Sequence, residues 1–283
     1  MAKDNRAKTE LGKYLENFPS GNFGLNAHFY KAECEYRDNQ FEEALKDYDY
    51  VLSQPDNIFT ENSLIQASQL SYKSGDFTKA LGYYERLDSV SNNNHNLLLS
   101  LAGEMRCNYE LKKFNDASRI GWKIRSMDKI PPELDREATF ISAKSFTELN
   151  DPSKALPLWR KLSGDTKSLE GAEAKYHVCE YYYNNNRYKD AENEVMDFIN
   201  KNTPHQYWLA KSFILLAHTY EKQNDVFQAT HTLKSIIENY SEKNDGITKE
   251  AEAYLKELEL KDNMGSGSKE VTPETPGTNK KKQ

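Results

Sequence analysis

Apolar and polar positions follow the period of an α-helix along most of the chain, and the pattern recurs six times in the same form. In residues 71–87, SYKSGDFTKALGYYERL, one aromatic residue stands three positions before an alanine and another stands four positions after it. Each copy contains two segments with apolar residues at i, i+3, i+4 and i+7, joined by a short polar turn. This pattern predicts a helical hairpin in each copy.

One alanine marks the same point in the second helix of every copy, with successive spacings of 36, 37, 38, 36 and 38 residues. A small residue usually lies twelve positions earlier, in the first helix, although the third copy has Met105 there. Small residues let two helices approach closely, and because one hairpin cannot bury its apolar face alone, we expect the hairpins to stack. The marker alanines are Ala44, Ala80, Ala117, Ala155, Ala191 and Ala229.

This set of positions resembles the tetratricopeptide repeat (TPR), in which a proline often follows the second helix, as Pro55 and Pro204 do here. The resemblance covers residues 25–240 and implies an all-α superhelix, a solenoid of six hairpins. The copies are two to four residues longer than the usual ~34. This variant is similar to the repeats of bacterial envelope lipoproteins and periplasmic coordinators.

The segment FINKNTPHQYWLAKSFILLAHTYEKQND (198–225) is also similar to the C-terminal region of large envelope-associated TPR proteins of Bacteroidetes. That resemblance implies a periplasmic or outer-membrane-associated protein. A cytoplasmic location is the alternative, because the charged opening MAKDNRAKTELGK does not have the pattern of a signal peptide.

The two ends of the chain depart from the repeat. Ala7 lies 37 residues before Ala44, so residues 1–24 are expected to form the second helix of a partial repeat, and we hypothesise that the parent protein continues upstream. Residues 246–263 predict an amphipathic capping helix. Residues 264–283, rich in Gly, Ser, Pro, Thr and Lys, predict a disordered tail.

Composition and charge exclude several classes of protein. Aromatic residues make up 12% of the chain, with 18 Tyr and 12 Phe, which is too many for a disordered chain. The net charge is −6 and the body of the chain has no basic run, which argues against nucleic-acid binding. No window reaches the ~18 consecutive apolar residues of a transmembrane helix. Three cysteines without a CxxC pair predict neither a disulfide framework nor a zinc site.

The sequence offers no catalytic motif. It lacks a phosphate-binding GxxxxGK[ST] loop, a GxSxG nucleophile elbow and a pair of histidines four residues apart on a helix. We therefore expect no catalytic residues, no bound metal, no cofactor and no enzymatic activity. The chain is interpreted as a binding surface for an extended or helical segment of another protein, of unknown oligomeric state.

The resemblance also implies where a partner would bind, because the first helices of TPR arrays line a concave face. Counting the small residue as position 8, positions 2, 5, 9, 12 and 13 are expected to contact the partner. Position 5 is apolar or aromatic throughout, so the Lys–Asn clamp for terminal carboxylates is absent. The expected contacts are Tyr36, Tyr72, Tyr109 and Tyr183 at position 12, Arg37 and Lys73 at position 13, and Arg106, Lys144, Glu180 and His218 at position 9.

Alternatives remain open at this point. The four tyrosines are equally suited to packing inside the array, with no role in binding. The chain could be a scaffold for assembling or coordinating a bacterial envelope complex. It could instead be a glycan-binding module of a nutrient-uptake lipoprotein, although such proteins need a large additional lobe.

Overall fold

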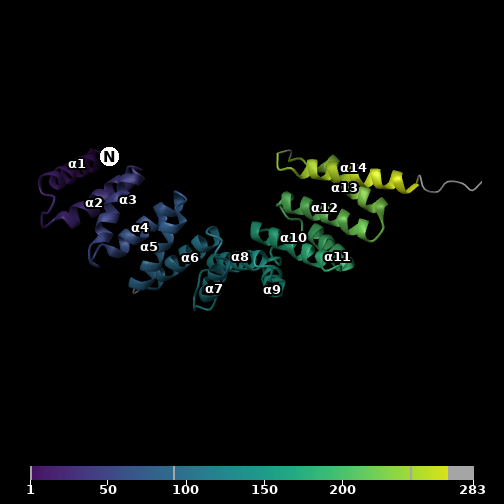
Figure 1. Ribbon diagram of the computed structural model, residues 1–283, viewed down its shortest axis with the longest axis horizontal. Coiled ribbons are helices and arrows are strands. Elements are labelled where there is room, and N and C mark those ends of the chain that lie inside the picture. Colours follow the sequence, from purple (N-terminus) through teal and green to yellow (C-terminus); the bar gives the residue numbers. More distant parts are fainter. Residues whose placement is uncertain (1, 92, 243, 267–283) are drawn as a thin grey trace, which may run out of the picture. The chain divides into compact units, whose positions relative to one another are not determined.

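The computed structural model describes residues 2–91, 93–242 and 244–266, and all regular structure in these ranges is helical (Figure 1). The helices are short, and most pair with the next helix along the chain. In order they are α1 (Ala2–Asn17), α2 (Gly24–Arg37), α3 (Phe41–Ser53), α4 (Thr60–Lys73), α5 (Phe77–Val90), α6 (Asn94–Glu110), α7 (Phe114–Arg125), α8 (Pro132–Glu148), α9 (Pro152–Leu162), α10 (Leu169–Asn184), α11 (Tyr188–Asn200), α12 (Gln206–Lys222), α13 (Val226–Asn239) and α14 (Ile247–Ser266).

Internal contacts divide the chain into two compact units, Met1–Leu158 and Trp159–Gln283. The first unit holds α1 to α8 and the start of α9, and the second holds the end of α9 and α10 to α14. Within each unit, first and second helices pack as hairpins and each hairpin packs on the next. The predicted all-α fold of stacked helical hairpins is confirmed.

Small residues at the helix crossings hold each hairpin together. All six marker alanines are at most 4% exposed, and the position-8 residues Ala32, Ser68, Met105, Ala143, Cys179 and Ala217 are fully buried. Large side chains such as Tyr48, Leu87 and Phe198 fill the space around them and are also fully buried. Each such burial contributes about 1.5–3 kcal/mol, so the repeated pattern of small and large residues supplies the core of each unit.

Every hairpin turn has the same backbone conformation. Two positions after the first helix ends stands a residue with left-handed φ, between 52° and 83° at these turns, whose N–H donates to the carbonyl of the position-12 residue. Glycine and asparagine adopt this conformation readily, whereas lysine does so at a cost. The left-handed residues are Asn39, Gly75, Lys112, Asn150, Asn186 and Asn224.

The third hairpin differs from the others four residues after its marker alanine, where Gly121 replaces a larger side chain. A Cβ at position 121 would lie 2.3 Å from Ser142 Oγ and 3.1 Å from the Ala138 carbonyl oxygen. Glycine therefore lets α7 approach α8 closely. The neighbouring Trp122 points outward and is 69% exposed.

The start of α12 departs from a simple capping pattern. Thr203, Pro204 and Gln206 would suit an N-cap, a first turn and a capping-box partner, but α12 begins at Gln206 with His205 as its N-cap residue. The Thr203 hydroxyl instead donates to the Thr166 carbonyl at 2.7 Å and accepts from the His205 N–H at 3.1 Å. Thr203 thus links the loop before α12 to the loop before α10 by a hydrogen bond.

At the C-terminal end, α14 packs on α13 and α12 through Ile247, Ala251, Tyr254 and Leu258. The disordered tail predicted for 264–283 lies, from residue 267 onward, outside the described residues. Across the ranges that the structure describes, no helix combines the length and apolarity needed to cross a bilayer.

Candidate partner-binding groove

In the first unit, α4, α6 and the beginning of α8 enclose a groove of about 440 Å³, here called the α4–α6–α8 groove. Nearly all of its lining comes from first helices, which sequence reasoning placed on the binding face. The lining residues are Gln69, Tyr72, Lys73, Tyr84, His95, Leu98, Leu99, Ala102, Arg106, Pro131 and Leu134. Three of the predicted contacts, Tyr72, Lys73 and Arg106, thus lie around one groove.

The floor of the groove depends on a glycine. Tyr84 of α5 is 5% exposed and lines the groove, and its ring lies against Gly103 of α6. A Cβ at position 103 would lie 2.4 Å from three ring atoms of Tyr84. The missing side chain at Gly103 therefore makes room for the tyrosine ring in the lining of the groove.

The rim of the groove is cationic. Arg106 donates from Nε and Nη2 to the two carboxylate oxygens of Glu137 on α8, at 2.5 and 2.6 Å. These bonds hold the guanidinium in place and raise the pKa of Arg106. Lys73 is exposed and makes no ion pair with any described residue. His95 at the start of α6 is also exposed. Lys73 lines the groove and offers a positive charge beside its apolar floor.

The position-12 tyrosines have a packing role that the sequence left open. Each lies close to the aromatic residue that opens the second helix of its own hairpin, with ring centroids 5.2–5.9 Å apart. The backbone carbonyl of each tyrosine also accepts the turn N–H. The pairs are Tyr36–Phe41, Tyr72–Phe77, Tyr109–Phe114 and Tyr183–Tyr188. The contact of each ring with the second helix thus stabilises the turn. The ring is only half-buried and remains accessible to a ligand.

No family model and no curated protein matches the sequence, but solved structures match the fold. A signal transduction ATPase with numerous domains from Pyrococcus horikoshii, with a tetratricopeptide repeat sensor, aligns with TM-score 0.60 and 14% identity over 92% of this chain and 45% of that chain. Yeast Tom70 aligns with TM-score 0.51 and 15% identity over 92% of this chain and 51% of that chain. This chain therefore spans about half the length of either protein.

The chain has the tetratricopeptide-repeat fold. A tetratricopeptide repeat protein from Parabacteroides merdae ATCC 43184 also aligns, with TM-score 0.44 and 16% identity over 89% of this chain and 91% of that chain. At these identities the comparisons establish the helical-repeat fold only, and the binding site has to be argued from this chain's own residues.

The other predicted contacts of the first unit are not among the lining residues of the α4–α6–α8 groove. Lys144 on α8 lies over the ring of Tyr109, 5.5 Å from its centroid, and over Phe140 at 5.2 Å. Burial raises the pKa of Tyr109 although Lys144 acts against the rise. Tyr36 and Arg37 belong to the first complete repeat, and Arg37 lines a different groove, between α1 and α2.

The second unit contains the remaining three predicted contacts. Burial works to raise the pKa of Glu180, but hydrogen bonds from His177 and Tyr176 hold it below its ordinary value. His218 stacks on Tyr254 of α14 with centroids 3.9 Å apart, and burial lowers its pKa. The ring centroids of Tyr183 and His218 lie 6.3 Å apart. Tyr183 and His218 thus lie near each other, with α14 against His218.

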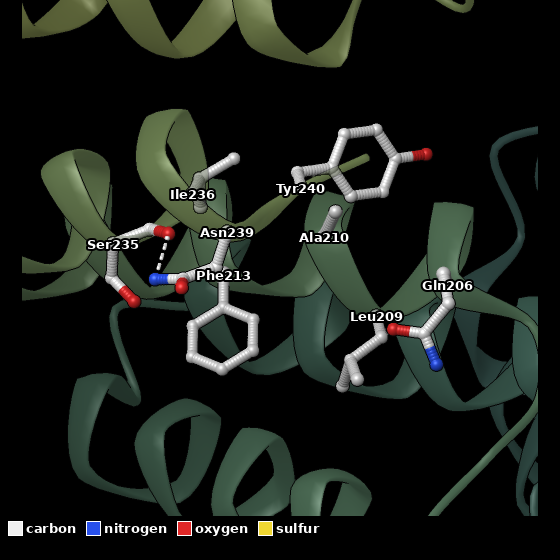
Figure 2. A pocket seen from close by; sticks show the side chains of 8 residues that line it. All are labelled: Gln206, Leu209, Ala210, Phe213, Ser235, Ile236, Asn239 and Tyr240. Carbon is white, nitrogen blue, oxygen red and sulfur yellow. Dashed lines mark hydrogen bonds between the residues drawn. The ribbon is translucent and has the colours of Figure 1, made fainter. Parts of the chain in front are cut away.

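A smaller hollow of about 230 Å³ in the second unit contains none of the predicted contacts (Figure 2). Leu209 and Phe213 of α12 and Ile236 of α13 form its apolar wall. The side-chain amide of Asn239 donates to the Ser235 carbonyl at 2.9 Å, so this polar group is engaged within its own helix. The hollow offers little to orient a polar ligand.

Sequence reasoning missed several residues of the α4–α6–α8 groove, among them His95, Leu98 and Leu134. The first helix of the third repeat begins at Asn94, and the Asn93 side chain caps it by accepting from the Asn96 N–H at 2.8 Å. The first turn of this helix brings His95 to the groove, and Leu98 follows one turn later. The signal available in the sequence was the capping asparagine before the apolar run NLLLS.

The cysteine side chains in the described part of the chain are buried in the core. Cys34, Cys107 and Cys179 are buried thiols, and burial raises the pKa of Cys107 and of Cys179 to about 12. In that state they are poor nucleophiles. Across the described ranges, no group of three or more His, Cys, Asp or Glu side chains is placed to hold a metal ion.

Proposed function

We propose that this chain is a non-catalytic TPR scaffold that binds a segment of a partner protein in the α4–α6–α8 groove. The observation that supports this best is the combination of an apolar floor with a cationic rim in one groove. Leu98, Ala102 and Leu134 offer a surface for apolar side chains. Beside them, Lys73, which forms no ion pair among the described residues, and the fixed Arg106 offer donors to the partner.

The dimensions of the groove fit a peptide segment. Ligand sites of about 300–1,000 Å³ enclose a few side chains, and the groove of about 440 Å³ falls in that range. Grooves between helices commonly accept an extended or helical segment that inserts apolar anchors. Tyr72 adds a rigid aromatic surface at low cost in side-chain entropy, as tyrosines do at many interfaces.

The experiment is affinity capture from the native cell envelope with the full chain and two variants. Leu98→Glu places a charge on the groove floor, at a half-buried residue. Trp122→Glu makes the same kind of change at a residue that is 69% exposed and outside the groove. The proposal predicts that Leu98→Glu weakens partner binding about tenfold or more, while Trp122→Glu binds as the parent does.

Equal retention of every partner by the folded Leu98→Glu variant would contradict the groove assignment. Circular dichroism on both variants checks that they fold. Tyr72→Phe is a useful third variant, because it keeps the ring packed against Phe77 and removes only the hydroxyl.

We further propose that the complex belongs to the bacterial cell envelope and that the scaffold assembles or coordinates it. This part rests on the resemblance of residues 198–225 to envelope-associated TPR proteins. Fractionation of native cells tests it separately: recovery of the protein with the periplasm or the outer membrane is expected. Recovery in the cytosol alone would overturn the envelope assignment and leave the groove proposal intact.

A further inference from the structure

Helix α7 carries an exposed tryptophan among basic side chains. Trp122 is 69% exposed, whereas Trp159 is buried and Trp208 is half-buried. Residues 112–129, which comprise α7 and the turns on either side of it, contain six Lys or Arg and two Asp, so their net charge is +4 in a chain of net charge −6. The exposed tryptophan and cations, here called the α7 surface, are Lys112, Lys113, Arg119, Trp122, Lys123 and Lys129.

In the repeat, Trp122 occupies a position that faces solvent. It lies five residues after the marker alanine of its hairpin, and every other copy except that of Met196 has a charged side chain there. The charged residues are Asp49, Glu85, Arg160 and Lys234. The hairpin therefore folds without an aromatic residue at this position. A single exposed apolar residue is common, so the cations around Trp122 are what indicate the kind of surface that it contacts.

These cations are able to meet anions from outside the chain. Three of the five form no ion pair with a described residue. The other two are Arg119, which lies 3.1 Å from Asp116, and Lys123, which lies 3.4 Å from Asp88. Exposed ion pairs of this kind contribute little to stability, so both cations can exchange their carboxylates for other anions. When Asp88 is counted as well, the excess falls from four positive charges to three.

The acidic remainder of the chain does not cancel this local charge. At physiological ionic strength, interactions between exposed charges are largely screened beyond about 8 Å. Helix α7 has 12 residues and is therefore about 18 Å long, so the α7 surface extends over more than that distance. A charged ligand at this surface responds to the cations nearest to it.

The α7 surface is also separate from the sites described above. Neither the α4–α6–α8 groove nor the hollow of Figure 2 is lined by a residue of α7. Peptide segments commonly bind in such grooves. A tryptophan beside lysines and arginines is instead typical of proteins at a membrane surface, where the indole lies at the level of the headgroups and the cations attract anionic lipids.

We propose that the α7 surface binds the anionic surface of a lipid bilayer, with Trp122 among the headgroups and the cations of the α7 surface against lipid phosphates. Phosphate oxygens are strong acceptors for Lys and Arg donors. Attachment through α7 keeps the first unit at the membrane. It leaves the α4–α6–α8 groove available to a partner, because α7 does not line that groove.

The test uses the full chain and lipid vesicles of two compositions. Co-sedimentation is expected with vesicles of phosphatidylethanolamine and phosphatidylglycerol, and not with vesicles of phosphatidylcholine alone. Binding is expected to weaken as salt is added, because the attraction is electrostatic. Trp122 is the most exposed of the three tryptophans, so its emission is expected to shift to the blue on binding and to be quenched by brominated lipids.

Two variants form a matched pair for the tryptophan. Trp122→Glu is expected to lower the affinity for the anionic vesicles about tenfold or more. Phe227→Glu makes the same kind of change at a residue that is 77% exposed on α13, and is expected to bind the vesicles as the parent does. In detergent-solubilised extract, Trp122→Glu is expected to retain the partner of the α4–α6–α8 groove, which separates the two sites.

A second matched pair tests the charges. Lys113→Glu combined with Arg119→Glu is expected to weaken vesicle binding about tenfold or more. Lys13→Glu combined with Lys189→Glu changes the net charge equally at exposed lysines elsewhere, and is expected to leave binding nearly unchanged. Circular dichroism checks that all the variants fold.

Absence of binding to the anionic vesicles overturns the proposal, and so does equal binding by the parent chain, Trp122→Glu and the variant with reversed charges at 113 and 119. Polyglutamate distinguishes the other class of ligand. A shift of the tryptophan emission on addition of polyglutamate, without a shift on addition of vesicles, would mean that the α7 surface binds an acidic protein and that the membrane assignment is wrong.

Discussion

Replacing Gly103 with alanine tests how closely α5 and α6 pack beneath the groove. In the interior of a helix, alanine is more favourable than glycine by about 1 kcal/mol. Gly82 in α5 has nothing within 4 Å of the position where a Cβ would lie, so Gly82→Ala is expected to stabilise the protein by about 0.5–1 kcal/mol. Gly103 lies in the interior of α6, where propensity alone predicts the same gain.

Packing reverses the sign at Gly103. The new Cβ would lie 2.4 Å from Cε1, Cε2 and Cζ of Tyr84, and that ring is only 5% exposed, so it has little room to move. Overpacking of this kind costs about 1–3 kcal/mol. After the gain in helix propensity of about 1 kcal/mol, the net result is a loss of up to about 2 kcal/mol. Because Tyr84 lines the α4–α6–α8 groove, partner binding is expected to weaken as well.

Urea denaturation monitored by circular dichroism measures both variants against the parent chain, and both glycines lie in the first unit. A lower midpoint for Gly103→Ala and a higher midpoint for Gly82→Ala, at similar slopes, is the expected result. If Gly103→Ala is as stable as Gly82→Ala, the close contact between Gly103 and Tyr84 does not determine stability and the reasoning fails.

Three further predictions follow from single residues. Lys112 has a φ of 59°, so Lys112→Gly is expected to raise the free energy of unfolding by about 0.5–1 kcal/mol in a urea titration; an unchanged midpoint would contradict this. Burial raises the pKa of the Glu104 carboxyl to about 7. Between about pH 4.5 and 7 the folded protein therefore holds a proton that the unfolded chain has released, so the free energy of unfolding falls as pH rises through that window. Glu104→Gln is expected to remove this fall in stability and to be more stable than the parent chain at pH 8 by about 3 kcal/mol. Equal losses of stability between pH 5 and pH 8 in both proteins would refute this prediction. Arg106→Lys keeps the charge but loses the two-pronged contact with Glu137, which is expected to cost about 1 kcal/mol by thermal or urea denaturation; full stability in the variant would show that this pair contributes nothing.

The fold was predictable because the same pattern of residues recurs six times along the chain. A small residue and an alanine twelve positions later recur at a nearly constant spacing, and both are buried in nearly every copy. Stacked hairpins are the simplest structure that buries these positions together. Deviations inside the pattern were harder to interpret: Met105 and Gly121 depart from it, and their consequences depend on how closely α7 approaches α8.

The groove was predictable only in part. Position 12 predicted Tyr72 as a contact, and Tyr72 lines the groove. The same position also accepts the turn hydrogen bond and packs on Phe77, which the sequence does not separate from binding. Tyr84 comes from a second helix and reaches the groove only because Gly103 lacks a side chain. Contacts of this kind arise between helices of different repeats, so one-dimensional spacing does not reveal them.

The measurement closest to the central claim is site-specific photo-crosslinking in native cells, with a photoreactive amino acid at Leu98 or, as the control, at Trp122. The account predicts that one partner segment crosslinks at Leu98 and is identified there by mass spectrometry of the joined peptides. It also predicts that this product disappears when Lys73→Glu reverses the charge of the rim, and that Trp122 yields none of it. Crosslinking of the same partner at Trp122 but not at Leu98 would contradict the account.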